Sequence, residues 1–108
     1  MSNPKYRWWG YARRIVRDYP RLVAAHAPTP DEERERDAVS KAIEATRQHP
    51  QGHERLNLIR LVYWEKPTRI LQEAAFHLHI SEITAKRWHG DFIRLVGKFC
   101  GFSVAEKV

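Results

Sequence analysis

Apolar residues recur along the chain at spacings of three and four, which predicts helices. No segment shows the alternation of apolar and polar residues that is typical of a strand. Proline and glycine interrupt the helical pattern and separate the expected helices. The interruptions fall at Pro20, Pro28 and Pro30, Pro50 and Gly52, Pro67, and Gly97 and Gly101. The pattern therefore predicts an all-α fold, a small bundle of about five helices.

The first expected helix covers about residues 4–25 and bends or ends near Tyr19, because Pro20 follows. Trp8, Tyr11 and Ile15 have the spacing of one helical face. An amphipathic arm that packs on the core explains these residues better than a platform on which nucleic-acid bases stack.

A second helix is expected to begin at Thr29 and to run to about Gln48. Thr29 is a good N-cap, Pro30 suits the first helical position, and Glu32 can reach back to the Thr29 amide. The acidic residues in the first turn interact favourably with the positive end of the helix dipole, so their presence is explained without a metal site. The expected apolar stripe comprises Val39, Ala42, Ile43 and Thr46.

The chain from about residue 53 to 65 is apolar nearly all round, which is typical of the central helix of a bundle. Lys66, Pro67 and Thr68 then break the helix. By sequence, residues 1–52 form an N-terminal helical segment and residues 53–108 a C-terminal part. We expect the two to pack as one compact unit, since 108 residues suffice for a single core.

A short helix, a tight turn and a longer helix are expected after Thr68. Ser81 is a good N-cap for the longer helix. His79 occupies the turn position that usually holds a left-handed Gly, at a cost of about 1 kcal/mol. Inward-facing residues are Ile70, Leu71, Ala74, Ala75 and Leu78 before the turn, and Ala85, Trp88, Phe92, Leu95 and Phe99 after it. This is the pattern of a helix-turn-helix.

Charge indicates a polyanionic partner, because the chain carries a net charge of +6 and its pI is about 9.8. Cys100 is the only cysteine, so an intrachain disulfide is excluded and a reducing cytoplasm fits. The chain has no apolar run long enough to span a membrane. We therefore expect a cytoplasmic protein that binds nucleic acid.

The start of the longer helix carries the candidate binding residues. Glu82, Ile83, Thr84, Lys86 and Arg87 remain outward there, and these residue types contact base edges and phosphates in a major groove. Arg94 and Lys98 follow at helical spacing and would continue a phosphate-contacting stripe or merely solvate the outer face.

The residues from Ile59 to Phe102, including Leu-His-Ile-Ser-Glu-Ile-Thr-Ala-Lys-Arg-Trp, resemble region four of bacterial sigma factors. They are more similar to phage and prophage late-gene regulators of the RinA and ArpU type. This resemblance implies sequence-specific binding to double-stranded DNA in a bacterial host and activation of late transcription, with host RNA polymerase as a further partner. It also implies DNA contacts from Ser81, Glu82, Ile83, Lys86 and Arg87, with Thr68 near the DNA backbone.

Other functions are less consistent with the residues. The histidine pairs, His49 with His53 and His77 with His79, lack a third ligand at zinc-like spacing, so no metal or other cofactor is expected. We find neither a nucleophile paired with a base nor a phosphate-binding glycine loop, so we do not expect an enzyme. The main alternative is a helical adaptor that binds RNA polymerase or the phage packaging machinery. A homodimer would suit a palindromic site, and the sequence leaves the oligomeric state open.

Overall fold

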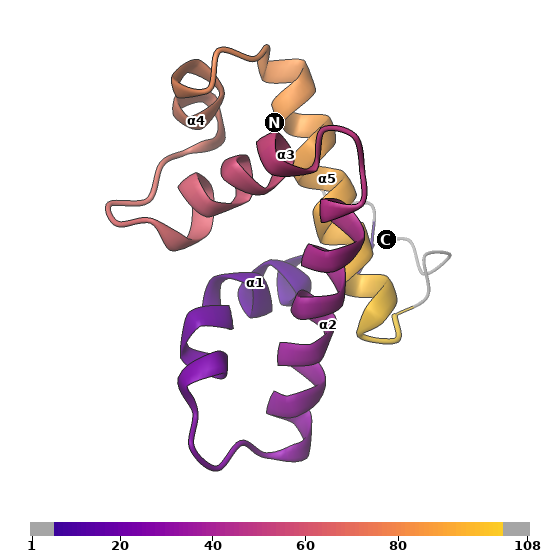
Figure 1. Cartoon of the computed structure of the whole chain (residues 1–108). Coiled ribbons are helices and arrows are strands. Elements are labelled where there is room, and N and C mark those ends of the chain that lie inside the picture. The colour runs from indigo at the N-terminus through magenta and orange to yellow at the C-terminus, as the bar shows by residue number, and fades with distance from the viewer. Residues whose placement is uncertain (1–5, 103–108) are drawn as a thin grey trace. The chain divides into compact units, whose positions relative to one another are not determined.

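The structure is a computed structural model that describes residues 6–102. Within this range five α-helices follow one another, and a π-helical turn extends the third of them (Figure 1). No strand occurs between residues 6 and 102, so the predicted all-α fold is confirmed. The elements are α1 (Trp9–Ala24), α2 (Pro30–Arg47), α3 (Gly52–Ile59), η1 (Arg60–Trp64), α4 (Leu71–His77) and α5 (Glu82–Phe99).

The chain forms two compact units, and both boundaries between them fall inside helices. The terminal unit combines residues 6–42 with residues 93–102, which include the C-terminal part of α5. The central unit comprises residues 43–92 and contains α3, η1, α4 and the first half of α5.

The terminal unit has an apolar core to which α1 contributes one full face. Trp8 and Ile15 are buried and Tyr11 is half-buried, so the predicted packing role of this segment is confirmed. Of the two outcomes expected near Tyr19, a bend or an end, the end is excluded, because α1 continues through Pro20 to Ala24. The other buried apolar residues of this unit are Ala12, Val16, Leu22, Ala38, Val39, Ala42, Ile93, Val96 and Cys100.

The predicted capping box at the start of α2 is present. The Thr29 N–H donates to Glu32 Oε1 at 2.9 Å, and the Glu32 N–H donates to Thr29 Oγ1 at 3.1 Å. The Thr29 amide accordingly lowers the pKa of the Glu32 carboxyl, with a smaller contribution from Arg21. Two orphan N–H groups of the helix start are thus satisfied locally, which fixes where α2 begins.

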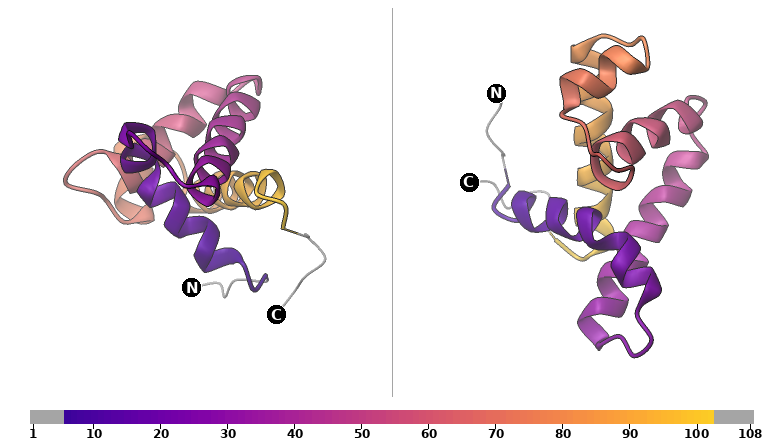
Figure 2. Two further views of the ribbon diagram at one scale, coloured as in Figure 1. Left: turned by 90° about the horizontal axis from the view of Figure 1, so that it is seen from below. Right: turned by 90° about the vertical axis from the view of Figure 1, so that its left-hand side faces the viewer.

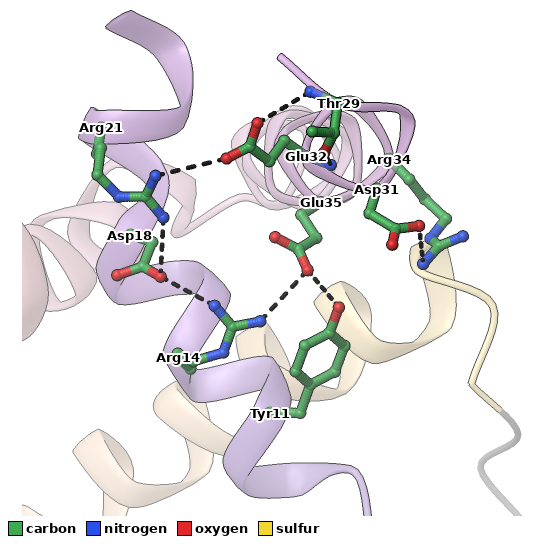
Figure 3. A network of polar contacts seen from close by, with 9 residues as sticks. All are labelled: Tyr11, Arg14, Asp18, Arg21, Thr29, Asp31, Glu32, Arg34 and Glu35. Atoms are coloured by element: carbon green, nitrogen blue, oxygen red, sulfur yellow. Dashed lines mark hydrogen bonds and ion pairs between the residues drawn. The ribbon is translucent and has the colours of Figure 1, made fainter. Parts of the chain in front are cut away.

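Arginines of α1 face acids of α2 within the terminal unit (Figure 3). Glu35 is buried and accepts hydrogen bonds from the Tyr11 hydroxyl and from Arg14 Nη2, the latter at 3.3 Å. Arg21 Nη1 lies 3.6 Å from Glu32 Oε2. Burial raises the pKa of the Tyr11 hydroxyl, and the nearby Glu35 carboxylate raises it further. Part of the basic charge of α1 is therefore neutralised internally.

In the central unit, α3 and η1 form the helix that the apolar run predicts, from Gly52 to Trp64. The π-helical turn in its last five residues was not predicted. Gly52 is the first residue of this helix, and a Cβ there would lie 2.8 Å from the Arg47 carbonyl oxygen, so only glycine fits without a shift. Figure 1 and the right-hand view of Figure 2 show α4 beside the N-terminal end of α5, where the candidate binding residues lie.

Candidate functional site

A Schellman motif closes the turn between α4 and α5. The Ile80 N–H donates to the Ala75 carbonyl at 3.0 Å, and the His79 N–H donates to the Phe76 carbonyl at 3.2 Å. His79 has a φ of 59°, so it takes the left-handed conformation expected from its position. The turn is therefore defined by backbone hydrogen bonds although it lacks the usual glycine.

A small core holds α4 against the start of α5. Ala75 and Ala85 are buried, and their small side chains permit close packing of the two helices. Trp88 is 4% exposed and belongs to the same cluster. Ile70 was expected to face inward but is 59% exposed, because it precedes α4 as its N-cap in extended backbone. The cluster comprises Leu58, Leu61, Ala74, Ala75, Ala85 and Trp88, with Val62, Leu71, Leu78 and Ile80 packed on it.

Ser81 caps α5 as the sequence predicts. Its Oγ accepts a hydrogen bond from the Thr84 N–H at 3.0 Å and donates one to Thr84 Oγ1 at 2.9 Å. Thr84 is half-buried, so its hydroxyl serves the cap in this structure. The cap fixes the first turn of α5 and, with it, the directions of the neighbouring side chains.

Four residues project outward from the first two turns of α5 and are called here the outer face: Glu82, Ile83, Lys86 and Arg87. Ile83 is 77% exposed. Within residues 6–102, Arg87 makes no hydrogen bond or ion pair, so its guanidinium is available for an external partner. The outer face does not extend beyond Arg87 to Gly90, because Gly90, about one turn further along α5, is buried.

Glu82 links the two helices at the edge of the outer face. Its Oε2 accepts a hydrogen bond from Gln72 Nε2 of α4 at 3.4 Å and lies 3.3 Å from Lys86 Nζ. Sequence reasoning missed Gln72, since nothing in the local pattern indicates a contact between residues ten positions apart. The carboxylate therefore already has two internal partners.

The buried side of α5 is supported by polar contacts that the sequence analysis did not identify. Arg55 Nη1 of α3 lies 3.1 Å from Asp91 Oδ2, and its guanidinium lies 5.4 Å from the Trp88 ring centroid. His89 stacks on Tyr63, whose hydroxyl lies 2.7 Å from His89 Nε2. These contacts couple α3 and η1 to α5, so they stabilise the position of the outer face.

The loop that leads to α4 is held at two points and exposes Thr68. The Arg69 N–H donates to the Leu61 carbonyl at 3.0 Å, and Arg69 Nη1 donates to Glu65 Oε1 at 3.1 Å. The hydrogen bond from Arg69 lowers the pKa of the Glu65 carboxyl, and the charge of Arg60 lowers it further. Thr68 thus sits on an ordered loop within the central unit.

The two predicted phosphate contacts, Arg94 and Lys98, belong to the terminal unit. Lys98 is exposed, and its Nζ lies 6.0 Å from the Phe99 ring centroid. Arg94 is half-buried and already interacts with another part of the protein, so its side chain is not free. The central unit therefore contains the outer face, the capping pair Ser81 and Thr84, and Thr68, whereas these two residues belong to the other unit.

Between residues 6 and 102 no group of three or more His, Cys, Asp or Glu side chains is placed to hold a metal ion. None of the helices in this range is long and apolar enough to cross a membrane. No protein-family model, curated protein or solved structure matches the chain, so its function has to be inferred from its own residues.

Proposed function

We propose that the chain is a sequence-specific regulator of transcription that binds double-stranded DNA. In this proposal α4, the turn and α5 form a helix-turn-helix, and the outer face enters the major groove. Arg87 contacts a base edge, and the N-terminal end of α5 lies nearest the bases. No catalytic step and no cofactor form part of this function.

One observation carries the proposal. The outer face presents an unpaired arginine and an exposed isoleucine on a helix start that is fixed by a cap, a closed turn and a buried tryptophan. A residue that reads bases must be held in position, because its hydrogen bonds and apolar contacts depend on direction.

The distribution of charge supports different roles for the two units in binding DNA. Residues 43–92 hold nearly equal numbers of basic and acidic residues, so most of the net charge of +6 lies on the terminal unit. Attraction to any polyanion depends on charge, whereas discrimination between sequences depends on base contacts. The outer face would then supply specificity, while arginines of the terminal unit add attraction that does not depend on sequence.

The likeness of residues 59–102 to sigma region four and to regulators of the RinA and ArpU type favours a role in late transcription of a phage or prophage. A promoter-proximal DNA site and contact with host RNA polymerase belong to this proposal. A second copy of the chain would bind a palindromic site, and the symmetry of the bound sequence reports on it.

The test is selection of duplexes from a random pool by the full chain at near-physiological salt. We expect one enriched sequence. Arg87→Ala should lose about tenfold or more in affinity for that sequence, because a bidentate contact to guanine contributes about 1–3 kcal/mol. Arg17→Ala replaces another exposed arginine, on α1, and should retain the sequence preference. A pool that shows no enrichment would rule out the proposal.

A second candidate, a helical adaptor without base readout, is favoured by one observation. Phe76 of α4 is 85% exposed, which is unusual for a large aromatic residue and is typical of surfaces that bind proteins. An adaptor that binds through Phe76 would keep its affinity as salt rises, whereas binding to DNA weakens steeply. Binding to RNA polymerase that survives high salt and is lost in Phe76→Ser would support the adaptor.

A further inference from the structure

Ile83 is the one apolar residue of the outer face, and it has no polar group that would explain its exposure to solvent. Its side chain is 77% exposed, although a buried site for an isoleucine would be favoured by about 2 kcal/mol. The Ser81 cap fixes the backbone on both sides of it. Because isoleucine is β-branched, its side chain adopts essentially one χ1 angle in a helix. Ile83 therefore presents a rigid apolar surface in one direction.

The surroundings of Ile83 indicate what this surface contacts. Arg87 follows four residues later, so the two side chains are neighbours on the helix, about 6 Å apart at Cβ. Lys86, on the same outer face, is also exposed. An apolar partner protein would have to bury these cations, whereas a polyanion whose surface carries an apolar group would pair with all three residues.

In a DNA major groove the C5-methyl group of thymine is the apolar group that base edges offer. We propose that Ile83 reads a thymine through this methyl group, next to the base that Arg87 contacts. The inference rests on the proposed function and adds the identity of one base. Since successive bases are about 3.4 Å apart, the thymine lies within about two base pairs of the Arg87 contact.

The experiment uses the duplex selected by the full chain, with each thymine replaced in turn by deoxyuridine, which lacks only the methyl group. We expect the replacement at one position to weaken binding about fourfold, the effect of one buried methyl-sized group. Ile83→Ala should bind the thymine duplex about as weakly as the wild type binds the deoxyuridine duplex. It should also respond to that replacement by less than twofold.

Two variants serve as controls. Phe76→Ala removes another highly exposed apolar side chain, from α4, and should retain the full response to deoxyuridine. Arg87→Ala should lose its base preference but keep the thymine response. We expect Ile83→Ala to fold normally, because the residue is exposed. Equal melting temperatures for this variant and the wild type would exclude misfolding as the cause of weaker binding.

The outcomes separate this inference from the function on which it rests. If one duplex is selected and deoxyuridine is tolerated at every position, Ile83 reads no methyl group and the inference is wrong while DNA recognition stands. A response that persists in Ile83→Ala would assign the methyl contact to another residue and also refute the inference. If no sequence is selected, both proposals fail.

Discussion

The indole ring of Trp8 lies directly on the backbone of Gly97, within the terminal unit. A Cβ added to Gly97 would fall 2.6 Å from Cη2 and 2.8 Å from Cε3 of the indole. The indole has aromatic neighbours as well, since Trp8 stacks on Tyr6 and Phe102 with centroid distances of 4.9 and 5.7 Å. Gly97 is thus the point at which the N-terminal aromatic residues meet α5.

Gly97→Ala should destabilise the protein, although alanine is a better helix former than glycine by about 1 kcal/mol. The added methyl group would overlap a buried ring that also stacks on two aromatic neighbours, and overpacking of this kind costs about 1–3 kcal/mol. Unfolding in urea, followed by tryptophan fluorescence, measures the change.

Gly10→Ala is the matched control for Gly97→Ala. Gly10 also lies in a helix, but a Cβ there would meet nothing within 4 Å. Gly10→Ala should therefore stabilise the protein by up to about 1 kcal/mol. If both substitutions stabilise it equally, the contact between Trp8 and Gly97 does not constrain the fold.

Local signals in the sequence correctly predicted where α2 and α5 begin. Thr29 and Glu32 form their capping box, and Ser81 caps α5, because each of these interactions spans only three residues. Gly97 was misread for the same reason. Glycine locally favours a break, yet α5 continues to Phe99, because the small residue is needed for a neighbour that is distant in the sequence.

The candidate site divides in the same way. The outward residues of α5 follow from helical periodicity, so Ile83 and Arg87 could be identified from sequence alone. Gln72 bonds to Glu82 and Arg55 pairs with Asp91, and these contacts depend on how the helices pack in the central unit. Periodicity carries no information on such pairs, so the residues that support the site became visible only in the structure.

His79→Gly should stabilise the turn between α4 and α5. His79 has a φ of 59°, a conformation that costs a residue with a Cβ about 1 kcal/mol more than glycine. We expect the free energy of unfolding to rise by about 0.5–1 kcal/mol. His79→Val should lower it, because β-branched residues tolerate this conformation least. A lower stability for His79→Gly than for the wild type would show that the imidazole makes a stabilising contact.

The capping box should make stability depend on pH in the acidic range. The pKa of Glu32 is lowered in the folded protein, chiefly by its hydrogen bond from the Thr29 amide. A carboxyl with a lowered pKa stabilises the fold above its unfolded pKa, and this contribution is lost as the pH falls through the folded value. Glu32→Gln should therefore be less stable than the wild type at pH 7, and the difference should shrink below about pH 4.5.

Glu33→Gln is the control for the pH experiment. Glu33 lies in the same first turn and is exposed, so it shares the interaction with the helix dipole but not the hydrogen bond to Thr29. Thermal unfolding of the three proteins between pH 3 and pH 7 measures the effect. Identical pH profiles for Glu32→Gln and Glu33→Gln would mean that the dipole alone accounts for the stabilisation.

Glu82→Gln should strengthen the binding of every DNA duplex and leave the sequence preference unchanged. The Glu82 carboxylate is engaged by Gln72 and Lys86, so we do not expect it to read a base. Removing its charge relieves repulsion from the phosphates and releases Lys86 for them. Affinity should rise about two- to fivefold at low salt, and the salt dependence should steepen by about one phosphate contact.

Titrations of Glu82→Gln at several salt concentrations test this expectation, with Glu73→Gln as the control. Glu73 is an exposed acid of α4 outside the outer face, so its replacement changes the net charge equally without releasing Lys86. If both variants gain the same affinity, net charge alone explains the effect. A loss of preference at one base in Glu82→Gln would instead place the carboxylate on a cytosine amino group, and Glu82 would then join Arg87 among the residues that read the sequence.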